Sequence, residues 1–458
     1  MDEQLMLLNK LRVIVGEGNI ITDLDAMQHY ALECTLNKLH MPAAVVIPAT
    51  TEEISAIAAL CNENRVPLTV RGGGTGVSGG TLSPAKGIIL SLERLNRIIE
   101  INKIDMIAVV EAGVVTKVLQ EAVLEEGLCF PQNISSAAAC FIGGNVAVAS
   151  GSPKSLKYGP TRNYVLNLEV VLPNGNIIWT GKNITKNATG YNFTQLFAGS
   201  EGSLGIITKV VLKLVPPTEE ILVLIPFNDI NRLFDCVHHL FLHHFSASSI
   251  EFVDKPGYEL VADFLQTKLP AASTLDGLLW IELEGKNTDL LMMELEMLSG
   301  LISSFTTEEM LVAQSESEIR RLWSLRSRIG DAVINRSTFR DVDIVVPRSC
   351  IHQMYTAIKA IAGAHHINYT AFGHIGNGNF HINILRENIA DEEQWEILLN
   401  DVISRIFDAA IALGGTLSGE HGTGKYQLPY LEKAISASQL DLMKQIKLVF
   451  DPNSILNS

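Results

Sequence analysis

Histidine and glutamate side chains gather in two short segments of the C-terminal half of the sequence. Phe-Gly-His-Ile-Gly-Asn-Gly-Asn-Phe-His-Ile-Asn carries His374 and His381, and Ser-Gly-Glu-His-Gly carries Glu420 and His421. Because side chains alternate between the two faces of a strand, His381 and Asn383 would share one face, onto which the glycine-flanked His374 could fold back. Two histidines and a glutamate with open coordination positions suit a catalytic divalent metal, although isolated histidines are often only hydrogen-bonded structural residues.

A second histidine group, His-His-Leu-Phe-Leu-His-His, spans residues 238–244. On a helix, His239 and His243 would lie four residues apart and could share a metal. No acidic third ligand is near them in the sequence, and the helix dipole favours histidines close to a helix C-terminus in any case. We therefore favour a structural role for this group.

The nine residues after Arg71, GGGTGVSGG, include six glycines. Gly74, Gly76 and Gly79 match GxGxxG, but a dinucleotide-binding Rossmann fingerprint must open a helix, whereas the strand-like run IILSL follows here. Glycines let backbone N–H groups approach a diphosphate closely, so we expect an anion-binding loop that needs no helix dipole. On these residues alone, a mobile surface turn is an equal alternative.

A second glycine pattern, GEHGTGK at residues 419–425, resembles the GxxxxGK of a P-loop. Tyr426 stands where Ser or Thr would hold magnesium, and a helical segment precedes the pattern where a P-loop requires a strand. The sequence therefore argues against a nucleoside triphosphatase.

Three more glycine-marked segments, IGGN, KNATGY and GSEGSLGIIT, follow the glycine-rich loop. The chain resembles the FAD domain of the vanillyl-alcohol oxidase / p-cresol methylhydroxylase superfamily, with the motifs in the same order. The segments that carry the resemblance are RGGGTGVSGG, SSAAACFIGGNVA, LKYGPTRNYVLNLEVVLPNG and KNATGYNFTQLFAGSEGSLGIIT. The pattern is closest to the glycolate oxidase subunit and D-lactate dehydrogenase branch. The resemblance implies that the loop cradles the FAD pyrophosphate.

The same resemblance implies that segments near residues 143–144 and 199–208 line the rest of the FAD. Some superfamily members attach FAD through a histidine in the glycine loop, but Thr75 stands at that position and the loop has no histidine, so non-covalent FAD is expected. The expected cofactor-binding residues are Arg71, Gly72, Gly73, Gly74, Thr75, Gly76, Gly79, Gly143, Gly144, Gly202, Gly205 and Ile207.

The C-terminal half resembles the FAD-linked oxidase C-terminal domain, whose members carry similar HxGxGNxH and GEHG segments. In metal-containing members, the positions that match His374, His381 and Glu420 bind a zinc-type divalent ion, here expected to be zinc, manganese or iron. The position of His421 serves as the base. Asn377 departs from the usual Asp, although this position is not a ligand.

The resemblance assigns the substrate carboxylate to Asn383 and to Arg326, the last residue of Leu-Trp-Ser-Leu-Arg. The planar guanidinium of an arginine pairs with a carboxylate through two hydrogen bonds. The family usually has Glu after this arginine, whereas this chain has Ser327. A surface salt bridge is the alternative role for Arg326.

Changes of pattern predict the domain organisation. We expect a helical N-terminal segment (1–41), an FAD-binding domain (42–219), a substrate or cap domain (220–410) and a C-terminal segment that returns to the flavin site (411–458). Thr50 and Glu53 have capping-box spacing before an apolar helical stripe, and a helix over 401–413 should end at Gly414. The expected fold class is α+β, with a two-part FAD-binding domain of the p-cresol methylhydroxylase type and an α+β FAD-linked oxidase cap.

The composition excludes several classes of protein. With 47% hydrophobic and 19% charged residues, the chain should form packed domains, and its net charge of -15 disfavours a nucleic-acid partner. No apolar run is long enough for a transmembrane segment, and the acidic N-terminus does not resemble a secretion signal. The six cysteines are scattered without a CxxC pair, which fits a cytoplasmic protein without its own iron–sulfur cluster.

Together these features predict an FAD-dependent dehydrogenase that oxidises a small D-2-hydroxy acid, D-lactate or glycolate, to the 2-oxo acid. The hydride would pass to flavin N5, with His421 as base and the metal lowering the hydroxyl pKa. An external acceptor, such as an electron-transfer flavoprotein, an iron–sulfur subunit or a quinone, would reoxidise the flavin. The alternatives are a D-2-hydroxyglutarate dehydrogenase, an oxidase that reduces oxygen, and a non-catalytic flavin-carrying subunit of a larger electron-transfer complex.

Two positions favour the shorter substrates. In hydroxyglutarate-specific relatives, the second carboxylate is held by the arginine, by a threonine one helical turn later and by a lysine further on. The matching positions here are Gly330 and Asp341, and an aspartate would repel that carboxylate. If the alignment with these relatives were shifted by one residue, Arg340 would instead stand at the lysine position. The alignment of this segment therefore determines which substrate the sequence favours.

Overall fold

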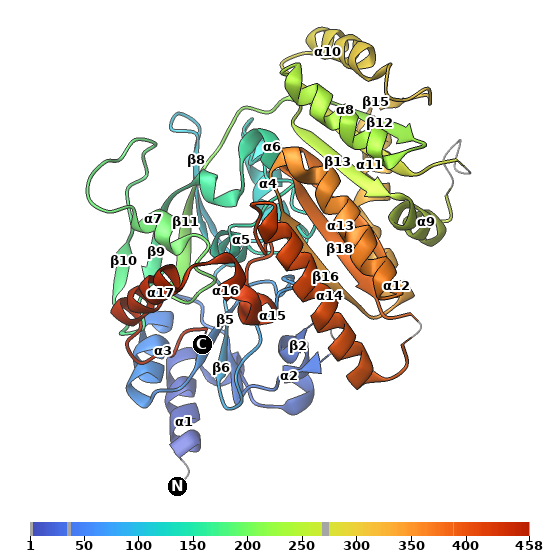
Figure 1. Ribbon diagram of the computed structural model, residues 1–458. Helices are drawn as coiled ribbons and strands as arrows, with labels where there is room; N and C mark the ends of the chain where they lie inside the picture. The colour runs from blue at the N-terminus through green and yellow to red at the C-terminus, as the bar shows by residue number, and fades with distance from the viewer. Residues whose placement is uncertain (1–2, 34–37, 268–273, 388, 458) are drawn as a thin grey trace. The chain divides into compact units, whose positions relative to one another are not determined.

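A computed structural model of the protein describes residues 3–33, 38–267, 274–387 and 389–457. The chain forms two compact units, each of which contains helices and sheets (Figure 1). The first unit comprises Met1–Gly151, Pro160–Pro217 and Glu420–Ser458, and the second comprises Ser152–Gly159 and Thr218–Gly419. The α+β fold class expected from the sequence is confirmed.

The first unit has a small sheet in the order β1-β4-β6-β5 and a larger antiparallel sheet in the order β10-β9-β11-β8-β7. In the small sheet β1 (Ile20–Ile21) is antiparallel to β4 (Ala44–Val46), which runs parallel to β6 (Ile88–Ser91) and β5 (Leu68–Arg71). The larger sheet consists of β10 (Ile177–Trp179), β9 (Val165–Val171), β11 (Ile206–Lys213), β8 (Ile107–Glu111) and β7 (Ile98–Asn102). The glycine loop leads from β5 to β6 without a helix, which excludes a Rossmann unit at this position.

The N-terminal segment, which was expected to be helical, is only partly so. Helices α1 (Glu3–Val15) and α2 (Leu24–Ala31) are accompanied by short strands, because β1 pairs with β4, and β2 (Leu32–Glu33) pairs with β3 (Lys38–Leu39). Short apolar runs such as Ile20–Ile21 carry too little periodicity to reveal such pairing.

Helix α3 (Thr51–Asn64) begins as its sequence predicted, because the Thr50 side chain accepts a hydrogen bond from the Glu53 amide at 3.1 Å. The Glu53 carboxylate accepts from the Ala49 amide at 2.7 Å, one residue before the position that a capping box requires. The predicted apolar stripe of this helix is buried and consists of Ile54, Ile57, Ala58 and Cys61.

The second unit is built on one antiparallel sheet in the order β15-β12-β14-β13-β17-β18-β16. Its strands are β12 (Glu219–Phe227), β13 (Ser249–Asp254), β14 (Gly277–Gly285), β15 (Leu311–Ala313), β16 (Phe339–Val345), β17 (Asn368–Gly373) and β18 (Asn379–Leu385). All of its neighbouring strands pair antiparallel. Along each strand, the side chains alternate between the two faces of the sheet.

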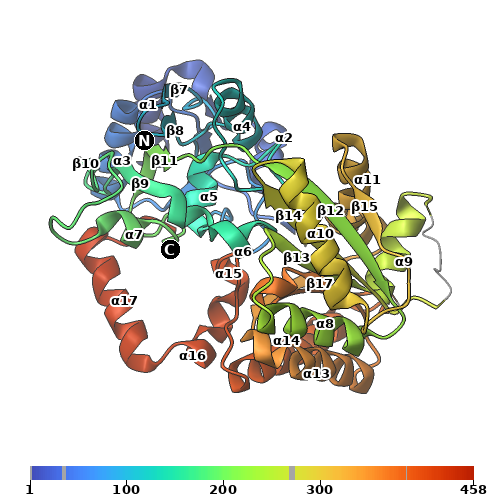
Figure 2. The same cartoon turned by 90° about the horizontal axis from the view of Figure 1, so that it is seen from above.

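Both faces of this sheet are covered by helices. One face packs against α9 (Lys255–Phe264), α11 (Glu316–Ser327) and α12 (Ile329–Arg336). Together they form a single hydrophobic cluster, which includes Trp280 and Phe372 of the sheet. On the other face, Phe252 and Phe380 of the sheet pack with Phe234 of α8 (Ile230–Leu242). Helices α13 (Ile351–Ala364) and α14 (Glu392–Ala412) lie side by side (Figure 1), and α10 (Thr288–Ile302) runs along β14 (Figure 2).

Helix α14 ends where the sequence predicted, with Gly414 in the left-handed region at φ +79°. One difference between the two units and the expected domain boundaries lies after α14. Residues 411–419 belong to the second unit, and only residues from Glu420 return to the first. At the end of the chain, Leu456 pairs with Leu68 of β5, so the C-terminal segment reaches the strand that leads into the glycine loop.

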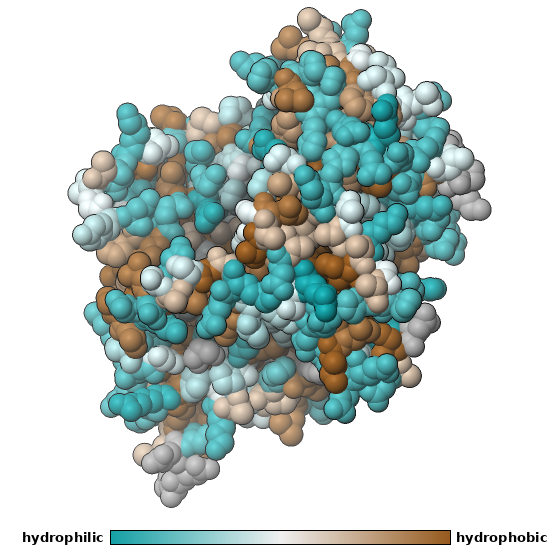
Figure 3. All heavy atoms as spheres, viewed as in Figure 1, coloured by the Kyte–Doolittle hydropathy of each residue, from teal (hydrophilic) through white to brown (hydrophobic). Residues whose placement is uncertain are grey.

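No helix in the described ranges is long and apolar enough to span a membrane. On the face of the molecule drawn in Figure 3, hydrophobic residues are interspersed with hydrophilic ones.

Residues 152–159 belong to the second unit although both of their flanks belong to the first. The buried Lys154 ammonium lies 3.2 Å from the Glu282 carboxylate and 2.5 Å from that of Glu284, and it also pairs with Glu220. Burial alone would lower the pKa of Lys154, but the three carboxylates outweigh it and raise the pKa. These ion pairs explain why a segment inside the FAD-domain sequence packs on β12 and β14.

Replacing Lys154 with methionine should destabilise the second unit by about 3 kcal/mol, because it leaves buried carboxylates without their cation. Lys157→Met is the matched control, since Lys157 pairs with the same Glu284 but is more exposed, and it should cost under about 1 kcal/mol. Urea unfolding followed by tryptophan fluorescence measures both, because three of the four tryptophans lie in the second unit. Equal effects of the two variants would contradict this account.

Candidate functional site

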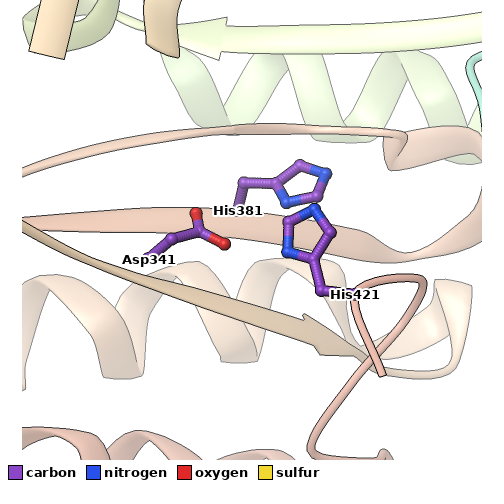
Figure 4. Close-up of side chains that lie close together, drawn as sticks. All are labelled: Asp341, His381 and His421. Atoms are coloured by element: carbon purple, nitrogen blue, oxygen red, sulfur yellow. The ribbon is translucent and has the colours of Figure 1, made fainter. Parts of the chain in front are cut away.

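Four polar side chains share one face of the second-unit sheet at the β16–β18 pair. Asp341 pairs with Asn383 and Asp343 pairs with His381, so all four project to the side that also carries Phe372. Figure 4 shows Asp341 and His381 projecting from neighbouring strands. His421, drawn in the same view, comes from the loop after α14. The sequence predicted that His381 and Asn383 share a face, and the strand register agrees.

His374 lies in the turn between β17 and β18, and its ring is 5.4 Å from that of His381, centroid to centroid. Gly373 allows this turn, because a Cβ at Gly373 would lie 2.4 Å from the Asn379 carbonyl oxygen. Nδ1 of His374 lies 2.6 Å from the fully buried Glu251 carboxylate. This contact favours a proton on Nδ1 and leaves Nε2 as a lone-pair donor.

Arg326, the candidate carboxylate-binding residue, is held by the same glutamate. Its Nε and Nη2 donate to the Glu251 carboxylate at 3.0 and 2.9 Å, and its guanidinium lies 4.6 Å from the centre of the Phe372 ring. Arg326 is 9% exposed, so the salt bridge is buried, in contrast to the surface pair that was its alternative role. Glu251 therefore fixes both Arg326 and His374, and it has no motif that sequence reasoning could have used.

Asp343 organises the opposite end of this polar group. One carboxylate oxygen accepts from Asn379 Nδ2 at 2.7 Å and lies 3.9 Å from His381 Nδ1. The other accepts from the Ser418 hydroxyl at 3.1 Å and from the Gly419 amide at 2.8 Å. The side chain of Asp343 thus ties the end of the second unit to the histidine strand, at the residue directly before Glu420.

Glu420 and His421 open the last segment of the first unit. The Glu420 carboxylate lies against Gly151, where an added Cβ would be 2.3 Å from Oε2, and it is 3.9 Å from His421 Nε2. A Cβ at position 151 would therefore displace this carboxylate from the place that it occupies. Sequence reasoning did not single out Gly151, since no motif links it to Glu420.

At some glycines of the loop, an added Cβ would collide with neighbouring atoms. A Cβ at Gly73 would lie 2.1 Å from the Ala139 carbonyl oxygen, and one at Gly74, where φ is +68°, would strike the Arg71 guanidinium. By contrast, a Cβ at Gly76 or at Gly144 would meet no atom within 4 Å. Among the described residues, the amides of residues 72–81 donate no hydrogen bond to the protein, as a loop that binds an anion requires.

The other expected cofactor residues differ in their surroundings. Gly72 approaches Gly144, with the added Cβ 3.6 Å from the Gly144 Cα, so the loop lies beside the start of α5 (Ile142–Val148). Gly143, Gly202 and Gly205 instead allow close packing, and their added Cβ atoms would lie 2.6 to 3.0 Å from Ala112, Asn457 and Val170. Ile207 is buried in β11, Gly79 has a φ of +76°, and Thr75 lies between Gly74 and Gly76 in the loop.

The second histidine group lies on α8 and at its C-terminal end. Nδ1 of His243 contacts the His239 carbonyl oxygen at 2.9 Å, and His238 contacts the Arg348 carbonyl oxygen. Within the described residues, no potential metal-binding group includes these histidines. These backbone contacts are of the kind that a structural histidine makes, and the structural role favoured from the sequence stays a prediction.

Comparison with known families identifies both halves of the chain. The "FAD binding domain" family matches residues 42–181, and the family "FAD linked oxidases, C-terminal domain" matches residues 216–458. Among solved structures, p-cresol methylhydroxylase with substrate bound has a TM-score of 0.83 at 17% identity, and the match covers 100% of this chain and 96% of that one.

Full-length relatives agree with these matches. Glycolate oxidase subunit GlcD of Bacillus subtilis is 36% identical, covering 93% of this chain and 90% of the relative. D-2-hydroxyglutarate dehydrogenase of Stutzerimonas stutzeri is 30% identical (98% and 97%), and D-lactate dehydrogenase of Anaerostipes hadrus is 32% identical (91% and 88%). The chain therefore belongs to the FAD-linked oxidases, and its fold is that of the p-cresol methylhydroxylase type.

Proposed function

We propose that this FAD-linked oxidoreductase is a dehydrogenase that oxidises a short D-2-hydroxy acid, D-lactate or glycolate, to the 2-oxo acid. The observation that carries the proposal is the polar group on one sheet face, where Arg326, Asn383 and two histidines accompany buried carboxylates. An arginine and an amide can bind a carboxylate, and the two histidines can hold a divalent ion beside the neighbouring hydroxyl.

We propose His374, His381 and Glu420 as ligands of a divalent ion, either zinc, manganese or iron. The residues fit such an ion, because Nδ1 of each histidine faces a buried carboxylate, which leaves each Nε2 as a potential ligand atom. Asp343 accepts a hydrogen bond from the Gly419 amide, and Glu420 is the next residue. Because consecutive Cα atoms are only about 3.8 Å apart, this hydrogen bond also limits where the Glu420 backbone can lie. When bound, the ion would lower the pKa of the substrate hydroxyl.

In this proposal Arg326 and Asn383 hold the substrate carboxylate. Glu251 occupies one edge of the Arg326 guanidinium. The remaining N–H groups of Arg326 can donate to the substrate. His421 would accept the hydroxyl proton on a ring nitrogen, since a neutral imidazole is abundant near neutral pH. The flavin supplies the hydride acceptor, N5.

FAD should be bound without a covalent link, because no residue of the glycine loop is a histidine. After acid precipitation, all of the flavin should be found in the supernatant. Yellow colour that remains with the precipitated polypeptide would contradict this expectation.

Reoxidation requires an external acceptor, for which an electron-transfer flavoprotein, an iron–sulfur subunit and a quinone are the candidates. The scattered cysteines provide no iron–sulfur motif in this chain and are consistent with a reducing compartment such as the cytoplasm.

The second candidate function is that of a D-2-hydroxyglutarate dehydrogenase, the activity for which two relatives are named. The strand register weighs against it. Asp341 pairs with Asn383 and projects to the His381 face, whereas Arg340 pairs with Ile384 and projects to the opposite face. The face with the histidines therefore carries an anion where a second substrate carboxylate would need a cation.

The ratio of kcat/KM for D-lactate to that for D-2-hydroxyglutarate tests this choice. Repulsion by Asp341 in a partly desolvated site should cost about 1–3 kcal/mol, roughly tenfold to a hundredfold in favour of D-lactate. The variant Gly330→Thr/Asp341→Lys should reverse the preference, and a Cβ at Gly330 meets no atom within 4 Å. Higher kcat/KM for D-2-hydroxyglutarate in the unmodified protein would show that the choice is wrong.

A further inference from the structure

The carboxylate of Glu201 binds two successive backbone amides of the segment that carries His421. Oε1 accepts from the Thr423 amide and Oε2 from the Gly424 amide, each at 2.8 Å. These residues are separated by more than 220 positions in the sequence, and all belong to the first unit. The two hydrogen bonds fix the chain two residues after His421.

Glu201 itself is fixed from both sides. Its φ of +52° is unusual for a residue other than glycine, and its amide donates to the Ala147 carbonyl oxygen at 2.8 Å. Its carbonyl oxygen accepts from Asn457 Nδ2 at 2.5 Å, and Asn457 Oδ1 accepts from the Val70 amide at 3.2 Å. A residue held in this conformation at both peptide groups presents its carboxylate in one place.

Ser78 of the glycine loop holds the same segment on its other side. Its hydroxyl donates to the His421 carbonyl oxygen at 2.9 Å, and its own carbonyl oxygen accepts from the Lys425 amide at 3.0 Å. The backbone around His421 is therefore tied both to Glu201 and to the loop that we expect to cradle the FAD pyrophosphate.

This arrangement also accounts for the P-loop-like pattern at residues 419–425. A Cβ at Gly422, where φ is +77°, would lie 2.9 Å from the Glu201 carboxylate, and one at Gly424 would lie 2.1 Å from the Ser78 carbonyl oxygen. The glycines expose backbone amides to an anion, as in a phosphate-binding loop, but the anion is the side chain of Glu201.

We propose that Glu201 is a positioning residue that holds His421 in place as the catalytic base. The inference rests on the proposed function, in which His421 accepts the hydroxyl proton. Displacing a base by about 1 Å can reduce the rate about a hundredfold. Glu201→Gln keeps one acceptor oxygen but turns an NH2 group toward the second amide, so the segment loses one of its two hydrogen bonds.

The test measures the rate of flavin reduction by D-lactate in single turnovers for the wild type, Glu201→Gln, His421→Ala and the double variant. Glu201→Gln alone should slow reduction about tenfold to a hundredfold without a comparable change in the apparent Kd of the substrate. In the His421→Ala background, the same substitution should change the rate less than about twofold, because a residue that acts only through His421 has nothing left to position. Flavin content, read from absorbance, should stay equal in all four proteins.

Amide hydrogen exchange gives a readout that does not depend on activity. Exchange at Thr423 and Gly424 should be faster in Glu201→Gln than in the wild type. Glu53→Gln is the matched control, because Glu53 also binds a backbone amide of the first unit, that of Ala49. This control should change neither the exchange at these two amides nor the rate of flavin reduction.

Two results would overturn the inference alone: an unchanged rate in Glu201→Gln, or an equal loss from this substitution with and without His421. A wild-type rate in His421→Ala would instead remove the base role itself and the proposed mechanism with it, so the two failures are distinguishable.

Discussion

Replacing His381 with alanine should abolish hydroxy-acid oxidation while the FAD stays bound. His381 lies in the second unit, whereas the glycine loop and the α5 segment lie in the first. Changes to the outer hydrogen-bond partners of metal ligands already reduce affinity or activity about 10- to 100-fold, so loss of a ligand should exceed about a hundredfold. The measurements are kcat/KM for D-lactate, metal content by elemental analysis and flavin absorbance.

His239→Ala is the matched control for this experiment, since His239 lies on α8 outside the polar group and should leave activity and metal content unchanged. Removal of the metal from the wild type with a chelator should reproduce the His381→Ala result, and adding back zinc, manganese or iron should restore activity only in the wild type. Full activity in protein shown to be free of metal would contradict the proposed ligand set.

Gly76→Ala should produce a folded protein that binds FAD poorly. A Cβ at Gly76 meets no protein atom within 4 Å, so the added methyl group should leave the protein's own packing intact but enter the space expected for the pyrophosphate. Crowding a close-packed site by one methyl group costs about 1–3 kcal/mol, roughly tenfold to a hundredfold in the dissociation constant of FAD. Titration of flavin-free protein with FAD measures the effect.

Two further glycine variants make this result specific. Gly300→Ala, on α10 of the second unit, also meets no atom within 4 Å and should leave FAD binding unchanged. Gly73→Ala should instead impair folding, because its Cβ would lie 2.1 Å from the Ala139 carbonyl oxygen. Wild-type affinity for FAD in Gly76→Ala would show that the pyrophosphate does not lie against this part of the loop.

Local patterns in the sequence predicted the elements that depend on local interactions. Helix α3 could be predicted because its cap and its buried stripe lie within one continuous segment. The shared face of His381 and Asn383 followed from strand alternation. The end of α14 followed from a glycine that can adopt a positive φ.

The residues that hold the site together could not be predicted in this way. Glu251 contacts His374 across 123 positions and Arg326 across 75, and Asp343 contacts Gly419 across 76. A single acidic residue in a strand has no spacing signature, and its role depends on which strands pair. For the same reason, the sequence did not predict that residues 152–159 belong to the second unit. Lys154 contacts its carboxylate partners only when β12 and β14 are adjacent.

Anaerobic titration of the purified, metal-replete flavoprotein with D-lactate shows whether the bound flavin accepts a hydride from a hydroxy acid. D-lactate or glycolate should bleach the visible flavin absorbance stoichiometrically, with formation of the 2-oxo acid, and D-2-hydroxyglutarate should give a much weaker response. A flavin that stays oxidised with all three hydroxy acids would contradict a catalytic role and would favour a flavin-carrying subunit of a larger complex.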